Sequence, residues 1–61
     1  EEAIQILNNI LKAAPKYAEA YRLLGLCQIQ LKKTDEACGN FKKAKELGDP
    51  NVDELITKYC K

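Results

Sequence analysis

The chain repeats itself within its 61 residues, and this internal period is the feature that most constrains its fold. Ala3 and Ala37 stand 34 positions apart, and the segments around them, EEAIQILNNILKAAP and DEACGNFKKAKELGDP, read alike. A repeat of about twenty to fifty residues is typical of stacked supersecondary units, each unable to bury its apolar face alone. We therefore predict packed helix-turn-helix pairs whose function is to hold a partner.

Apolar residues recur at spacings of three and four along four separate segments, which is the pattern of one face of an α-helix. Pro15 stops the first segment, since proline lacks the backbone donor and restricts the residue before it. Short connections between the segments force sequential helices to lie antiparallel. We predict an all-α fold of antiparallel helical hairpins, stacked as a short right-handed α-solenoid, with helices near residues 1–13, 17–31, 35–47 and 52–60.

Local signals mark the ends of these helices and one close contact between helices. Thr34 is expected to cap the third helix, and Asn51 is expected to cap the fourth with Glu54 three residues later. Gly48 stands where a left-handed residue ends the third helix. Gly25 lies in the middle of the second helix, where glycine costs about 1 kcal/mol relative to alanine. We therefore expect a neighbouring helix to approach closely at Gly25.

The segment AEAYRLLGLCQIQLKKTDEACGNFKKAKELGDP resembles a tetratricopeptide repeat, a family defined by a string of small and large packing positions. The residues that fall on those positions are Tyr21, Leu24, Gly25, Ala37, Phe41 and Ala44. The resemblance covers the whole chain and implies a single unit over residues 1–61. Within it, residues 1–15 match the second helix of a preceding repeat, residues 18–50 a full repeat, and residues 51–61 a solvating or capping helix.

Three positions depart from the family pattern. Gln28 stands where the family usually has an aromatic residue, and Ile10 stands where it has alanine. Pro50 comes one residue late because Gly48 is inserted. These departures loosen the local packing without shifting the period.

The residue types in the chain argue against catalysis and metal binding. Histidine and serine are both absent from the sequence, which removes Ser/His and Cys/His nucleophilic pairs and the commonest metal ligand. The nine carboxylates lie mostly at helix starts or at solvent-facing positions, where capping and solvation explain them better than acid–base work. The three cysteines show no CxxC spacing, and without histidine they do not complete a zinc site. We expect no catalytic residue, no metal site and no cofactor.

Charge and hydropathy limit the kinds of partner that the chain is expected to have. Ten basic residues against nine acidic ones give a net charge of +1, so no net field attracts a phosphate backbone or an anionic membrane. The longest apolar run, LLGLC at residues 23–27, is far shorter than the roughly 20 residues of a bilayer span. We predict neither a nucleic-acid partner nor membrane insertion. Because the chain begins EEAIQ and contains no methionine, we also expect it to be a piece of a longer protein.

The cysteines bear on the redox compartment. Cys38 and Cys60 are nearly equidistant from the turn expected near residue 49, so antiparallel packing of the last two helices places them face to face. Two states remain open, a disulfide that staples the short chain or two reduced cysteines in a core. A disulfide favours an exported or periplasmic location, and reduced cysteines favour the cytoplasm. Cys27, on the apolar stripe of the second helix, is expected to be a small buried hydrophobe.

The end of the chain carries a second resemblance. The pattern AC..F.KAKELG followed by LI.KYCK is similar to the closing segment of some bacterial tetratricopeptide proteins, several of them exported. This resemblance implies the same location as a disulfide does.

The family resemblance also implies a ligand groove on the concave side, lined by the first helix of each pair. Here the candidate residues are Glu19, Arg22, Leu26, Ile29 and Gln30. An equal alternative for Leu26 and Ile29 is packing against a neighbouring repeat. Family members that grip carboxylate-ended chaperone tails have an asparagine four positions after the basic residue. Here Leu26 follows Arg22, which argues against chaperone-tail binding by this repeat.

Three functions follow as hypotheses. The first is a non-catalytic scaffold segment that binds a peptide or a partner protein on its concave helical face. The second is a structural cap or a self-association module, which meets neighbouring repeats or a second copy through residues 1–13, because that segment is rich in apolar residues. The third, an RNA-binding helical array of the pentatricopeptide kind, is disfavoured by the balanced charge and by the phase of the signature.

Overall fold

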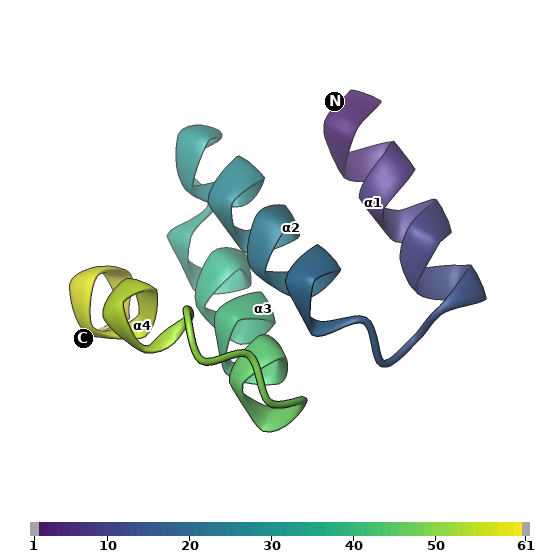
Figure 1. The fold of residues 1–61 in the computed structure, drawn as a ribbon. Helices are drawn as coiled ribbons and strands as arrows, with labels where there is room; N and C mark the ends of the chain where they lie inside the picture. Colours follow the sequence, from purple (N-terminus) through teal and green to yellow (C-terminus); the bar gives the residue numbers. More distant parts are fainter. Residues whose placement is uncertain (1, 61) are drawn as a thin grey trace.

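The computed structural model describes residues 2–60 and contains four α-helices within them (Figure 1). Their bounds are α1 Glu2–Ala13, α2 Ala18–Gln30, α3 Thr34–Glu46 and α4 Asp53–Tyr59. No strand occurs between residues 2 and 60, so the all-α prediction is confirmed and each helix boundary lies within about one residue of its predicted place. Glu1 in the predicted first helix and Lys61 in the predicted capping segment lie outside the described residues.

The helices form a thin slab with α2 between its two sequence neighbours. α2 packs against α1 on one side and α3 on the other, and α4 packs against α3 (Figure 1). In Figure 1 α4 is strongly foreshortened while α1, α2 and α3 run across the view, so α4 is inclined to the other helices. The extents of the described chain are 30 × 25 × 14 Å. A slab this thin leaves every helix with at least one open face.

The larger core cluster joins α3 to α2 and α4 through fully buried residues. Its members, each with no exposed surface, are Ala37, Phe41, Ala44 and Val52. Phe41 lies directly against Gly25 of α2, because a Cβ built on Gly25 stands 2.7 Å from Cδ1 of the Phe41 ring. The predicted close approach of a neighbouring helix at Gly25 is therefore confirmed, and its cause is a phenyl ring that needs the space of a missing side chain.

A smaller cluster joins α1 to α2. Leu7 of α1 packs with Ala20 and Leu24 of α2, and the exposed fractions of these three residues are 9%, 1% and 6%. Partly buried residues complete the contact: Ile4, Ile10, Leu11 and Cys27. Cys27 is thus half-buried at this interface, whereas the sequence predicted a buried residue.

The ends of α3 and α4 differ from the sequence predictions. Thr34 does not cap α3, since the carbonyl of Lys33 accepts the first helical hydrogen bond, from the Ala37 N–H at 3.0 Å. The helix begins early because Lys32 adopts a left-handed φ of 62°, which ends α2 in a tight turn. Gly48, by contrast, has the left-handed φ predicted for it, at 100°.

Asn51 likewise does not cap α4. Val52 occupies the cap position, because its carbonyl accepts the N–H of Ile56 at 2.9 Å, and no side chain bonds the helix start. Val52 is fully buried against α3, so packing fixes where α4 begins. The Asn51 backbone N–H instead donates to Oδ1 of Asp49 at 2.9 Å.

The contact between Phe41 and Gly25 yields a first prediction. Gly25→Ala should lower the free energy of unfolding by about 1 to 2 kcal/mol, because overpacking against the ring outweighs the helix propensity that alanine adds. Gly39→Ala is the matched control: Gly39 is also helical but has open space around it, so alanine there should raise stability by about 0.5 to 1 kcal/mol. Urea unfolding followed by circular dichroism measures both, and equal gains at the two glycines contradict the prediction.

Candidate interaction surface

The two charged candidates on α2 are engaged within the chain. The guanidinium of Arg22 donates from Nε to Oδ2 of Asp49 at 2.8 Å, and its Nη2 lies 3.8 Å from a carboxylate oxygen of Glu19. Asp49 belongs to the turn between α3 and α4, and its side chain is only 6% exposed. Arg22 therefore ties α2 to that turn, which opposes its use as a free charge for an incoming ligand.

The Asp49 carboxylate is the centre of this tie. One oxygen accepts from Arg22 and the other accepts the backbone N–H of Asn51. A buried carboxylate needs such partners because desolvation of an unpaired charge is costly. Sequence reasoning did not find this residue, since Arg22 and Asp49 are 27 positions apart and no local spacing joins them.

The apolar candidates on α2 separate into two roles. Ile29 packs against the Phe41 cluster, as Leu26 also does on one side. Leu26 and Gln30 in addition line an apolar groove between α1 and α2 with a volume of about 360 Å³. We call this the α1–α2 groove; its lining residues are Ala3, Ile6, Leu7, Leu23, Leu26, Cys27 and Gln30. Packing against a neighbouring repeat was one of two equal alternatives for Ile29, and in the structure Ile29 packs against the core of this chain.

Two large apolar side chains of the α1–α2 groove face solvent. Ile6 is 52% exposed and Leu23 is 38% exposed. Ile6 belongs to the apolar residues of the segment 1–13 for which the sequence predicts a covered surface, whereas Leu23 was not predicted as a site residue. Ile6 lies off the face of α1 that packs against α2 through Ile4, Leu7 and Leu11, so its side chain is largely exposed.

The departure at Gln28 has a polar explanation. The Oε1 of Gln28 accepts a hydrogen bond from Nδ2 of Asn40 at 2.6 Å, and its Nε2 donates to Oε2 of Glu36 at 3.3 Å. Both partners lie on α3, so this amide network joins α2 to α3 where the family usually places an aromatic side chain.

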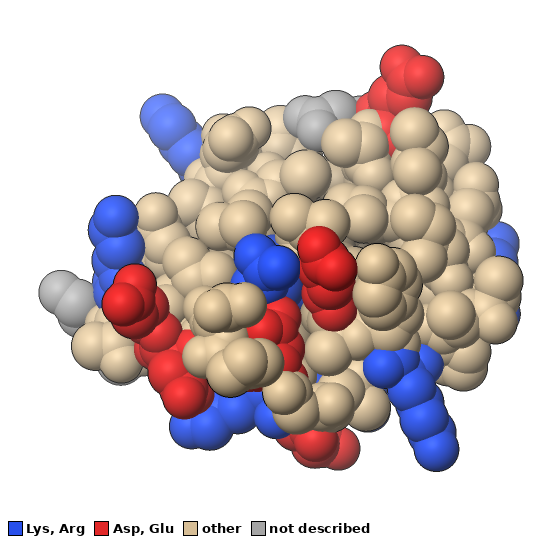
Figure 2. All heavy atoms as spheres, in the orientation of Figure 1, with Lys and Arg blue, Asp and Glu red and all other residues tan. Residues whose placement is uncertain are grey.

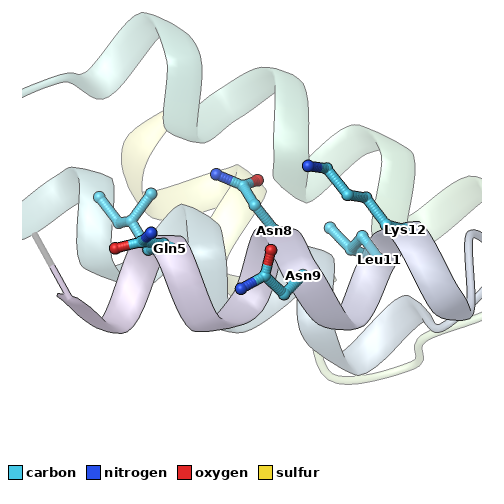
Figure 3. A pocket seen from close by; sticks show the side chains of 6 residues that line it. Gln5, Asn8, Asn9, Leu11 and Lys12 are labelled. Atoms are coloured by element: carbon cyan, nitrogen blue, oxygen red, sulfur yellow. The ribbon is translucent and has the colours of Figure 1, made fainter.

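A second recess runs along α1 and has a volume of about 670 Å³ (Figure 3). All of its lining residues come from this one helix, and those labelled in Figure 3 are Gln5, Asn8, Asn9, Leu11 and Lys12. Groups on a single helix do not converge on a ligand from several sides, as the groups of a binding pocket do. This recess is larger than the α1–α2 groove but is the weaker candidate.

Charge is distributed unevenly over the helices. Figure 2 shows a largely uncharged surface over α1, with charged groups concentrated over the side of α3 and α4. Among the described residues of α1 the charged side chains are Glu2 and Lys12, near its two ends. Between residues 2 and 60 no group of three or more His, Cys, Asp or Glu side chains is arranged to hold a metal ion. No helix in that range combines the length and apolarity needed to cross a bilayer.

The structure joins Cys38 of α3 to Cys60, directly after α4, by a disulfide with a Cα–Cα distance of 5.6 Å. Both cysteines line a recess of about 450 Å³ together with Thr34, Asp35, Gly39, Lys42 and Tyr59. The ring of Tyr59 also lies 6.3 Å, between centroids, from that of Phe41. The bridge holds the far end of α4 against the start of α3.

This arrangement of antiparallel helices, with small residues at the closest helix contacts and an open apolar groove, is that of a helical-repeat protein. The family model of the tetratricopeptide repeat matches residues 1–38, which is more than half of the chain. The chain therefore belongs to the tetratricopeptide repeat family, whose members act in general as non-catalytic scaffolds for protein–protein interactions. Comparison with curated proteins and with solved structures finds no match.

A second prediction concerns the tie between Arg22 and Asp49. Asp49→Asn and Arg22→Gln should each destabilise the protein by about 2 kcal/mol, because each leaves a charged partner unpaired in a poorly solvated place. The double variant should lose less than the sum of the two, which a double-mutant cycle from urea unfolding measures. Glu19→Gln, at the exposed end of the same network, is the control and should change stability by less than about 0.5 kcal/mol. Strict additivity would show that the two groups are not coupled.

A third prediction concerns the cysteines. Thiol titration of the purified, air-oxidised chain under denaturing, non-reducing conditions should give one reactive thiol, that of Cys27. The paired substitution Cys38→Ser with Cys60→Ser should cost about 3 kcal/mol, because it releases a loop of 22 positions in the unfolded state. Three reactive thiols would contradict the pairing, and Cys27→Ser is the control that leaves the bridge intact.

Proposed function

We propose that this chain is a scaffold segment that binds a peptide or a partner protein on the exposed side of α2. The observation that carries the proposal is the α1–α2 groove, an apolar depression in which Ile6 and Leu23 stand exposed. Exposed apolar side chains beside a preformed depression are typical of surfaces that bind other proteins.

The five candidate residues on α2 have different roles in this proposal. Leu26 and Gln30 contact the partner, Leu26 through its apolar side chain and Gln30 through its amide. Glu19 lies at the edge of the surface, where its side chain is 53% exposed. Arg22 and Ile29 shape the surface from below, through the tie to Asp49 and the Phe41 cluster. Partner selection therefore rests on apolar contact more than on charge.

Binding of this kind needs no reaction. The α1–α2 groove is lined by apolar side chains together with Cys27 and the single amide of Gln30, which suits desolvation of an apolar ligand more than proton transfer. The proposal involves no cofactor, no nucleic acid and no membrane. If the disulfide between Cys38 and Cys60 forms in the cell, the protein acts in an oxidising compartment, which supports an exported location.

A second candidate function is self-association through residues 1–13, or capping of neighbouring repeats by the same segment. The exposed side chain of Ile6 favours it, because one copy could cover that surface of another. Sedimentation velocity over a range of concentrations separates the two functions. A strict monomer removes the self-association form, and a dimer that Ile6→Asp dissociates supports it.

The scaffold function yields a fourth prediction. Peptide ligands are selected from a random phage library on the 61-residue chain. Their affinity for the Leu23→Asp variant should be at least about tenfold lower than for the unchanged chain, equivalent to roughly 1.4 kcal/mol. Leu31→Asp is the matched control, since Leu31 is a similarly exposed leucine, at 41%, that lies outside the groove lining. Ligands should bind Leu31→Asp within about twofold of the unchanged chain. Equal affinity for the two variants, with both folded by circular dichroism, would contradict the proposed surface.

A further inference from the structure

The side of α3 that points away from the core carries a distinct set of residues. The buried residues of α3 share one side of the helix, which faces α2 and α4. Four exposed residues share the opposite side, at spacings of four, three and four positions: Asp35, Gly39, Lys42 and Glu46. We call these four residues the outer stripe of α3.

The internal repeat shows that neighbouring helices do not cover the outer stripe. The 34-position offset matches its last three members with exposed residues of α1, all labelled in Figure 3: Gln5, Asn8 and Lys12. α1 is followed in the chain by three helices and α3 is preceded by two, yet these positions stay open on both. The exposure of the outer stripe is therefore a property of the repeat itself.

Gly39 has no packing role within the described residues that explains a glycine. A Cβ built on Gly39 meets nothing within 4 Å, whereas a Cβ built on Gly25 collides with the Phe41 ring. Glycine is unfavourable in the interior of a helix and is useful there only where another group must approach closely. The matching residue of α1 is Gln5, so the repeat does not demand glycine at this position. The space at Gly39 therefore suits a surface that approaches α3 from outside the chain.

Opposite charges flank Gly39 along the outer stripe. Asp35 lies four positions before Gly39, Lys42 lies three positions after it, and all three residues line the recess of about 450 Å³ beside the disulfide. The ion pairs among residues 2–60 join other side chains, so within that range both charges are free. In two antiparallel copies of α3 that cross near Gly39, each Asp35 lies opposite the Lys42 of the other copy. The stripe is thus complementary to itself about a two-fold axis.

The charges select one register of this pairing. A crossing centred between Gly39 and Lys42 places Asp35 opposite Glu46 of the other copy, which is repulsive. The net charge of +1 adds little general repulsion between copies. The two central positions of the matching stripe on α1 carry uncharged amides, so α1 lacks this pattern.

We propose that the outer stripe of α3 binds the same stripe of a second copy of this chain. The two helices lie antiparallel with Gly39 at the crossing, and Asp35 pairs with Lys42 in both directions. Small residues at a crossing allow two helices to approach closely. One pair of helices buries little surface compared with a stable interface, so the dimer is weak and forms at high concentration.

The dimer extends the scaffold function without depending on it. The outer stripe shares no residue with the α1–α2 groove, so dimerisation leaves both grooves available. A ligand with two binding segments would then gain avidity, a consequence that rests on the proposed scaffold function.

The test begins with sedimentation velocity of the air-oxidised 61-residue chain, from dilute to millimolar concentration. We expect a reversible equilibrium between monomer and dimer. Its dissociation constant should rise at least about threefold from low to physiological salt, because salt screens exposed ion pairs. A strict monomer at every concentration overturns the proposal.

Charge reversal tests the register. Lys42→Glu and Asp35→Lys should each weaken self-association at least about tenfold, because each replaces two attractive contacts with two repulsive ones. An equimolar mixture of the two variants should associate within about threefold of the unchanged chain, since every charge then meets its opposite. Lys16→Glu, in the turn between α1 and α2, matches the charge change of Lys42→Glu and should associate within about twofold of the unchanged chain.

Gly39→Gln tests the crossing. Glutamine is the residue that α1 carries at the matching position, so the variant should fold, while its side chain holds the two helices apart. Self-association should weaken at least about tenfold. Gln5→Ala is the control on α1 and should associate within about twofold of the unchanged chain. Circular dichroism verifies the fold of every variant.

The outcomes separate this dimer from the other functions. A dimer that Lys42→Glu leaves unchanged, or that the mixture of the two charge variants fails to restore, overturns the proposed pairing. A dimer that Ile6→Asp dissociates and Lys42→Glu does not overturns it as well, and places self-association at residues 1–13. Peptide ligands that need Leu23 test the scaffold function separately, because Leu23 lies outside the outer stripe.

Discussion

The packing of the Phe41 ring against Gly25 is the contact on which the rest of the structure depends. It sets the distance between α2 and α3, and Ala37 and Ala44 extend the same close approach along α3. With that distance fixed, Val52 and Tyr59 can pack on the same cluster and place α4. A small chain has little apolar surface to bury, so the close packing at this helix–helix contact contributes a large share of its stability.

Polar interactions then constrain the relative orientation of the helices, which apolar packing alone does not determine. The ion pair of Arg22 and Asp49 joins the start of α2 to the turn after α3, and the amides of Gln28 and Asn40 join the same two helices nearer the other end of α2. These contacts constrain the relative rotation of the central hairpin. They also engage Arg22, the basic residue of α2, in an intramolecular ion pair.

The helices and the packing positions could be predicted from sequence because both depend on short spacings, and the role of Gly25 followed from the helical pattern around it. The residues that cap α3 and α4 could not, because Lys32 adopts a left-handed conformation without being glycine and Val52 is buried in the core. The lining of the α1–α2 groove was only partly predictable. Leu26 and Gln30, two of the residues that the sequence proposed, line it, whereas the engagement of Arg22 and the exposure of Ile6 depend on how α1 and the turn at Asp49 lie in space.

The thin slab of helices has a consequence for motion. Among the helices of residues 2–60, α2 and α3 each have helical neighbours on two sides, while α1 and α4 each have one. Local opening should cost least where fewest contacts must break, so the outer helices separate from the slab before the central hairpin does. The walls of the groove therefore differ in rigidity, with a firm side formed by α2 and a compliant side formed by α1, which gives the surface some freedom to adjust its width to what enters.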